Sequence, residues 1–251
     1  MKFFSLLVLL ALLATPALAA PLASDAGRYQ ACLALVTSAP ERAVETAQAW
    51  RIENGGVPAL HCLALAQFAR QDYPAAMASF DKAVKNSIAA RDGKAVTLLS
   101  QAADAAMLAG QPRAAVGFLD SAIAGPGGIS LSARAEASLR VSRAEALVDL
   151  KREKDAALDL DKATKLDPQI PFGWLLRATL ARRMGDFKTA EVAILKAAEQ
   201  APDSADIQYE AGNIAAAQGN DALARTAWVA AARADPDSPA GKAANKALLG
   251  D

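Results

Sequence analysis

Two cysteines and a single histidine are the residues of this sequence with the widest chemistry, and Cys32, His61 and Cys62 all lie in its N-terminal quarter. Cysteine thiolates and histidine nitrogens bind zinc, but a zinc site requires three or four spaced ligands. His61 beside Cys62 does not supply such a set. A metal or redox role is therefore disfavoured, and we expect no cofactor.

The remaining residues offer little for catalysis. His61 lies in the apolar run of residues 60–63, which favours a packing or surface role over proton transfer. No serine nucleophile elbow, glycine-rich phosphate loop or paired-histidine zinc motif occurs. Asp159 and Asp161 are two residues apart on an expected helix and therefore point in different directions. We expect the protein not to be an enzyme.

The first residues show the three zones of a secretory signal peptide. Lys2 supplies positive charge, residues 3–14 form a leucine-rich run, and residues 15–19 supply small side chains before a cleavage site. The apolar run is shorter than the ~20 residues of a membrane-spanning helix, and Pro16 ends it. We expect cleavage of residues 1–19 and a periplasmic or secreted domain over residues 20–251, without a membrane span. An uncleaved membrane anchor is the alternative.

Composition and charge exclude one class of partner. Basic and acidic residues number 27 each, and loss of the leader with its single lysine leaves 26 basic against 27 acidic residues. A net charge of −1 gives negligible long-range steering, and nothing indicates a nucleic-acid binder. The apolar content owes much to alanine and little to aromatic residues, which suits closely packed helices.

A step of 34 residues organises the C-terminal half. Pro168, Pro202 and Pro236 follow this step, as do Gly185 and Gly219. Alanines keep the same step in two series, at positions 156, 190 and 224 and at positions 163, 197 and 231. Glycine suits the end of one helix because its φ can become positive, and proline cannot continue the next helix. The pattern predicts repeated pairs of closely packed helices.

On these residues the chain resembles the tetratricopeptide repeat family. Trp174 to Pro202 carries the family pattern nearly whole, with Gly185, Asp186 and Phe187 at its turn. Residues 205–236 repeat the pattern, and residues 57–88 and 96–125 carry it less completely. A degenerate first copy is indicated by the likeness between residues 31–35 and 61–65.

The resemblance implies an all-α, right-handed superhelical solenoid of about six helix-turn-helix repeats with a C-terminal capping helix. We expect repeats near residues 27–56, 57–90, 96–128, 137–170, 171–204 and 205–238, and the cap over residues 239–249. The loop of residues 125–128, Gly-Pro-Gly-Gly, interrupts the array after the third repeat. One interpretation makes this loop a hinge between two half-solenoids.

Proteins of this family expose the first helix of each hairpin on a concave surface that takes a peptide or a partner's helix. By this resemblance, the groove positions of the last two repeats are Phe172, Leu175, Thr179, Arg182, Arg183, Tyr209 and Asn213. The same rule points upstream to His61, Phe68, Asp104 and Glu145. An alternative interpretation makes Arg182 and Arg183 solvated surface charges, and makes Phe172 and Tyr209 packing residues between repeats.

The resemblance also bears on the two cysteines. Cys32 and Cys62 occupy equivalent places in adjacent first helices, where equivalent atoms are about 8–10 Å apart, whereas a disulfide needs Cα atoms within ~7 Å. The short first repeat could shift its helix enough to close this gap. Because an exported chain with two cysteines favours a bridge, we expect a Cys32–Cys62 disulfide that secures the weak first repeat.

Three functions follow. The favoured hypothesis is a scaffold or adaptor that binds a peptide or partner protein in the cell envelope through its concave face. The alternative is a structural repeat protein that acts by self-association or within an envelope assembly, without a peptide groove. The third, an enzyme or small-ligand receptor, is disfavoured because convergent polar groups are lacking.

Overall fold

The computed structural model describes residues 24–250, so the expected signal peptide at residues 1–19 lies outside the described part of the chain. Residues 24–250 form thirteen α-helices, one short 3₁₀ turn and no strands. The helices are α1 (Asp25–Ser38), α2 (Pro40–Ile52), α3 (Gly56–Ala69), α4 (Tyr73–Ala90), α5 (Ala95–Leu108), α6 (Pro112–Ile123), α7 (Ala133–Asp149), α8 (Glu153–Leu166), α9 (Pro171–Arg183), α10 (Phe187–Gln200), α11 (Ala205–Ala217), α12 (Asp221–Ala234) and α13 (Pro239–Leu249). Across residues 24–250, no helix combines the length and apolarity needed to cross a bilayer.

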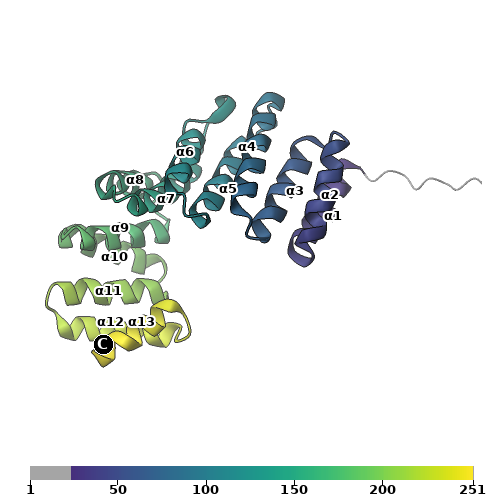
Figure 1. Ribbon diagram of the computed structural model, residues 1–251. Coiled ribbons are helices and arrows are strands. Elements are labelled where there is room, and N and C mark those ends of the chain that lie inside the picture. The colour runs from purple at the N-terminus through teal and green to yellow at the C-terminus, as the bar shows by residue number, and fades with distance from the viewer. Residues whose placement is uncertain (1–23, 251) are drawn as a thin grey trace, which may run out of the picture.

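These helices confirm the predicted all-α solenoid. The first twelve pair into six hairpins, from α1–α2 to α11–α12, and α13 packs on both helices of the last hairpin as a cap. Figure 1 shows two arms that meet at an angle near α6 and α7, with the first three hairpins in one arm. The fourth hairpin begins at Ala133, four residues before its expected start, because Ser132 caps α7 by accepting from the Ala135 N–H.

The 34-residue step has a local cause in the turns inside the hairpins. Gly185 and Gly219 have φ of 78° and 77°, a left-handed conformation that glycine adopts without strain. The next residue in each turn, Asp186 or Asn220, accepts a hydrogen bond from a backbone N–H three residues on and so caps the second helix. One helix therefore ends and the next begins at the same place in each repeat.

The core is a row of four clusters, as expected for a solenoid in which each repeat packs mainly on its neighbours. Helix α7 belongs to two of them. Its Leu139 and Ala146 pack with α3–α6, whereas Val141, Ala144 and Leu147 pack with α8 and α9. Helix α7 is therefore the shared wall of the two arms.

The outer side of this junction carries a buried ion cluster. Asp159 of α8 is 4% exposed and accepts from both Arg140 and Arg143 of α7, at 2.8 and 2.6 Å. Arg143 also pairs with Asp120 of α6 and thereby links both arms. Within the described chain, the other carboxylates around this cluster are also paired with Arg or Lys, so the cluster is neutralised internally.

The loop of residues 125–128 lies next to this junction. Its 3₁₀ turn contacts α4, α5 and α6, and Gly127 lies near the Ile88 side chain. The loop therefore packs against both the second and the third hairpin. The hinge interpretation stays a prediction.

Candidate functional site

A groove runs along the first helices α5, α7 and α9, on the face opposite the ion cluster. It consists of two adjoining cavities of about 250 and 260 Å³ that share Met107 and Glu145 as lining residues. We call this surface the concave groove, and its lining residues are Ala103, Asp104, Met107, Leu108, Leu119, Ser142, Ala144, Glu145, Val148, Asp149, Leu160, Leu176, Thr179, Leu180 and Arg183.

Helical spacing gathers these residues on one face. On α7, Glu145, Val148 and Asp149 are three and four residues apart and therefore lie on the same side of the helix. The same spacing places Thr179 next to Arg183 on α9. Each first helix thus contributes an apolar floor position and a polar rim position.

The rim of the groove is acidic. Asp104, Glu145 and Asp149 line it, and Arg183 is the only basic residue among the lining residues. Within residues 24–250, none of the three carboxylates forms a salt bridge. The groove therefore holds two negative charges in excess over its one positive charge.

The surroundings of the groove raise the pKa of two of these three carboxyls. Burial raises the pKa of Asp104 above its ordinary value, because the charged form is less well solvated. Burial also raises the pKa of Glu145, and the negative charges of Asp104 and Asp149 raise it further. Both carboxyls therefore gain from a neighbouring positive charge.

These carboxylates do not form a metal site. In the described part of the chain, no three His, Cys, Asp or Glu side chains converge as metal ligands. Asp104, Glu145 and Asp149 are instead spread along two helices. An elongated ligand suits this arrangement better than a single ion.

Of the seven groove residues expected in the last two repeats, Thr179 and Arg183 line the concave groove, and the expected upstream residues Asp104 and Glu145 line it too. Phe172 is 49% exposed at the start of α9, outside both cavities. Leu175 is half-buried and packs against the core cluster of α9–α11, and Tyr209 is half-buried on α11. A partner-binding role for these last three residues stays a prediction.

Arg182 and Asn213 are engaged inside the molecule. The Arg182 guanidinium donates to both carboxylate oxygens of Glu210, at 2.7 and 3.2 Å, and so links α9 to α11. Asn213 donates to Glu210 and accepts from the indole N–H of Trp228. Arg182 is therefore neither a free groove residue nor a solvated surface charge, because its guanidinium forms an ion pair with Glu210 of the next repeat.

The groove contains residues that the sequence analysis missed, chiefly Met107, Val148, Asp149 and Leu176. Asp104 and Glu145 had both been expected to face the groove. Met107 lies three residues after Asp104, and Asp149 lies four residues after Glu145. Extending each expected position by one helical turn would have found both residues.

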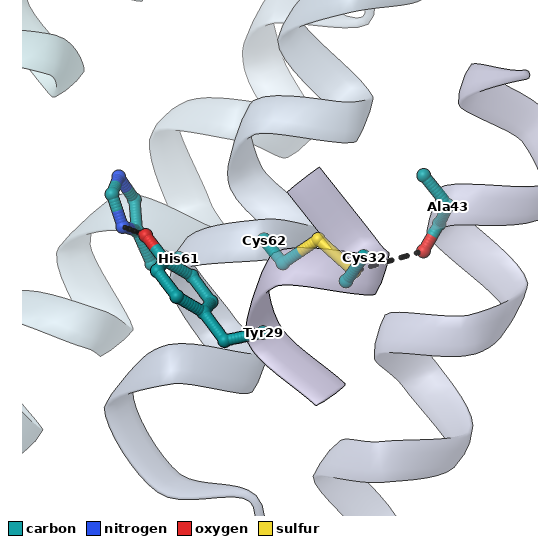
Figure 2. Close-up of a disulfide and its surroundings, with 5 residues drawn as sticks. All are labelled: Tyr29, Cys32, Ala43, His61 and Cys62. Atoms are coloured by element: carbon teal, nitrogen blue, oxygen red, sulfur yellow. Dashed lines mark hydrogen bonds between the residues drawn. A yellow bond between two sulfur atoms is a disulfide. The ribbon is translucent and has the colours of Figure 1, made fainter. Parts of the chain in front are cut away.

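A disulfide joins Cys32 of α1 to Cys62 of α3 (Figure 2), and their Cα atoms are 6.2 Å apart. This distance is shorter than the spacing of equivalent atoms on ordinary neighbouring helices. A single residue, Ala39, separates α1 from α2, so the first hairpin lacks the longer turn of the later ones. Cys32 also lies against the carbonyl oxygen of Ala43 on α2, at 3.9 Å.

A polar chain beside the disulfide links three first helices. The Tyr29 hydroxyl of α1 donates to His61 Nδ1 of α3 at 2.6 Å, and His61 Nε2 donates to Gln101 Oε1 of α5 at 2.8 Å. Burial lowers the pKa of His61, outweighing the hydrogen bond to Gln101, which raises it. Both ring nitrogens of His61 are therefore occupied by contacts between helices, which agrees with the packing role that its apolar sequence context favoured.

The comparisons with known proteins agree with this architecture. Residues 175–239 match the tetratricopeptide repeat family. The structure is similar to that of PilW, a widely conserved type IV pilus biogenesis factor, with a TM-score of 0.68, 15% identity and coverage of 87% of this chain and 97% of that chain. PilF of Pseudomonas aeruginosa gives a TM-score of 0.67 at 15% identity, covering 89% of this chain and 97% of that chain.

A third solved structure, YrrB, is described as a TPR protein with an unusual peptide-binding site. Its TM-score is 0.56 at 21% identity, with coverage of 79% of this chain and 96% of that chain. No curated protein matches the chain. At these identities the structural likenesses establish the fold, and the family match identifies the repeats. Residues 175–239 therefore carry tetratricopeptide repeats, and the described chain as a whole shares the fold of these solved structures.

Proposed function

We propose that this protein binds another polypeptide along the concave groove and does so in the cell envelope. The observation that supports this function is the pair of adjoining cavities between α5, α7 and α9, with an apolar floor and unpaired charges on the rim. Protein-binding surfaces commonly combine an apolar centre with a polar rim. The fold itself is that of a protein-interaction scaffold.

The envelope location rests on the sequence and on similar proteins. Residues 1–19 have the three zones of a signal peptide, and a disulfide persists in an oxidising compartment. PilW, one of the similar structures, is a type IV pilus biogenesis factor, which is consistent with this compartment.

Blocking the groove tests the proposal. A library of random 12-residue peptides would be selected on the oxidised chain beginning at residue 20, and the affinities of the selected peptides would be measured by calorimetry. Thr179→Trp places a large ring in the second cavity, and we expect it to weaken binding by about tenfold or more. Thr226→Trp is the matched control, because Thr226 is exposed on α12 outside the groove.

Each outcome has a clear meaning. Peptide affinity that falls in Thr179→Trp and stays within about twofold of wild type in Thr226→Trp supports the groove. Circular dichroism would verify that both variants keep the wild-type helix content. Peptides that bind equally to wild type and Thr179→Trp, or a library that yields no binder, would contradict the proposed function.

Self-association is the second candidate, and exposed apolar residues on the second helices favour it. Leu158 of α8 and Val192 of α10 are 71% and 54% exposed and lie one repeat apart. Such an outward apolar face is a common interaction surface. Sedimentation of wild type and of Leu158→Glu/Val192→Glu would test it, because only a dimer held by this face becomes a monomer in the variant.

A further inference from the structure

We propose that the ligand of the concave groove is a basic segment of polypeptide, in which lysine or arginine is flanked by apolar residues. This inference rests on the proposed function and adds the chemistry of the partner to it. The groove supplies three features that such a segment would match: unpaired carboxylates, an apolar floor, and cavities of side-chain size.

The first argument is the contrast between the two faces of the junction. On the ion-cluster face, Asp120, Asp155 and Asp159 are each paired with an arginine of the same molecule. On the groove face, Asp104, Glu145 and Asp149 have no such partner within residues 24–250. Their charges remain available for a partner's cations.

The second argument is that the carboxylates of the groove lose part of their hydration. Asp104 and Glu145 are exposed at the rim, and their partial burial raises the pKa of both carboxyls. A cation that enters the groove would replace part of the lost solvation and stabilise the charged carboxylates. An acidic segment would add like charge at the same place, which costs binding energy.

The third argument is the floor between the charges. Met107 lies at the meeting point of the two cavities, and Val148 and Leu176 line the second one. Lysine and arginine have aliphatic stems that pack on such surfaces while their charged ends reach polar groups. Cavities of about 250 and 260 Å³ are smaller than the roughly 300–1,000 Å³ of small-molecule pockets, so they suit side chains of a longer ligand.

Matched charge variants test the inference. The probes are the peptides selected on wild type, together with versions in which every lysine and arginine is replaced by glutamine. The groove variant is Asp104→Asn/Glu145→Gln/Asp149→Asn. The control variant, Glu45→Gln/Asp203→Asn/Asp237→Asn, removes the same charges from exposed positions outside the groove that form no salt bridge within residues 24–250.

We expect the selected peptides to be enriched in lysine or arginine. The groove variant should weaken their binding about tenfold, because exposed charge pairs contribute about two- to threefold each, and the control variant should stay within about twofold of wild type. Glutamine versions of the peptides should lose a similar factor on wild type and little on the groove variant. Raising NaCl from about 50 to 500 mM should remove most of the difference between wild type and the groove variant.

Arg183 gives an opposite test at the same site. As the only basic lining residue, it repels a basic ligand, so Arg183→Gln should strengthen binding about twofold to threefold. Selected peptides that are acidic or uncharged, or that bind the groove variant as tightly as wild type, would overturn the basic-ligand inference. If those same peptides still lose affinity in Thr179→Trp, the proposed function survives that failure, and if they do not, both fail.

Discussion

The two ends of the solenoid hold consecutive first helices together by different chemistry. At the N-terminal end, the Cys32–Cys62 disulfide joins α1 to α3. At the C-terminal end, the Arg182–Glu210 ion pair joins α9 to α11 at the corresponding interface. The interface between first helices is thus covalent in the N-terminal repeats, where the sequence pattern is weakest, and ionic in the C-terminal repeats, where it is strongest.

The turns inside the hairpins explain the difference. The turn between α9 and α10 has three residues, whereas Ala39 alone separates α1 from α2. The short turn makes the first repeat shorter than the 34-residue step and brings α1 closer to α3. Helices α9–α12 follow the 34-residue step and are held by the packing that each repeat shares with the next. Helices α1 and α3 depart from this step and are held by a disulfide, which does not depend on regular repeat packing.

Removing the disulfide should have the largest effect. Cys32→Ala/Cys62→Ala should lower the free energy of unfolding of the first two hairpins by about 3–4 kcal/mol, because the bridge closes a loop of 30 residues. Hydrogen exchange by mass spectrometry would measure this, with faster exchange expected in α1–α4. Exchange in α9–α12 serves as the internal control, and equal acceleration there would contradict a local role for the bridge.

Breaking the ion pair should have the next largest effect, at the other end. Arg182→Met leaves the Glu210 side chain, 8% exposed, with a buried charge, and should cost about 2–3 kcal/mol, because Arg182 itself is partly solvated. Arg182→Met/Glu210→Met removes both charges and should recover most of the loss. Thermal unfolding would measure both variants. A double variant less stable than the single one would show that the pair is favourable in itself.

Adding one methyl group should sharpen the packing side of the comparison. A Cβ at Gly212 of α11 would lie 2.4 Å from the Trp228 ring, so Gly212→Ala should destabilise the last hairpin by about 1–2 kcal/mol. Gly117→Ala is the matched control, because nothing lies within 4 Å of that position in α6. The control should stabilise by up to ~1 kcal/mol through helix propensity. Urea unfolding measures both, and loss of stability in both variants would refute the steric explanation.

Acidification should have the smallest effect, confined to the N-terminal end. Because the pKa of folded His61 is lowered, its contribution to stability is complete above the unfolded value of about 6.5 and is lost as pH falls from that value through the lower pKa of the folded state. Stability measured from pH 7.5 to 5 should therefore decline for wild type. His61→Gln should flatten this decline, and an unchanged slope in the variant would assign it to other groups.

The repeats could be predicted from sequence because each rests on local residues. Gly185, Asp186 and the closing Pro202 act within their own repeat, so their spacing reveals the fold directly. The Arg182–Glu210 contact could not be predicted in this way, because it depends on how two repeats rotate past each other. The groove was found only in part because single positions were named where a whole helix face lines it. Asp149 is one helical turn beyond the expected Glu145, and both residues line the same cavity.

The sharing of α7 between two core clusters has a consequence for how the chain can be divided. The glycine-rich loop of residues 125–128 looks like a natural place to cut, yet a fragment that ends there lacks Leu139 and Ala146, which complete the core of the first arm. A fragment that begins after α7 lacks Val141, Ala144 and Leu147 of the second core. During synthesis the core of the first arm is completed only when α7 has emerged from the ribosome, because Leu139 and Ala146 belong to that core. At the bend visible in Figure 1, both arms therefore depend on one shared helix, α7.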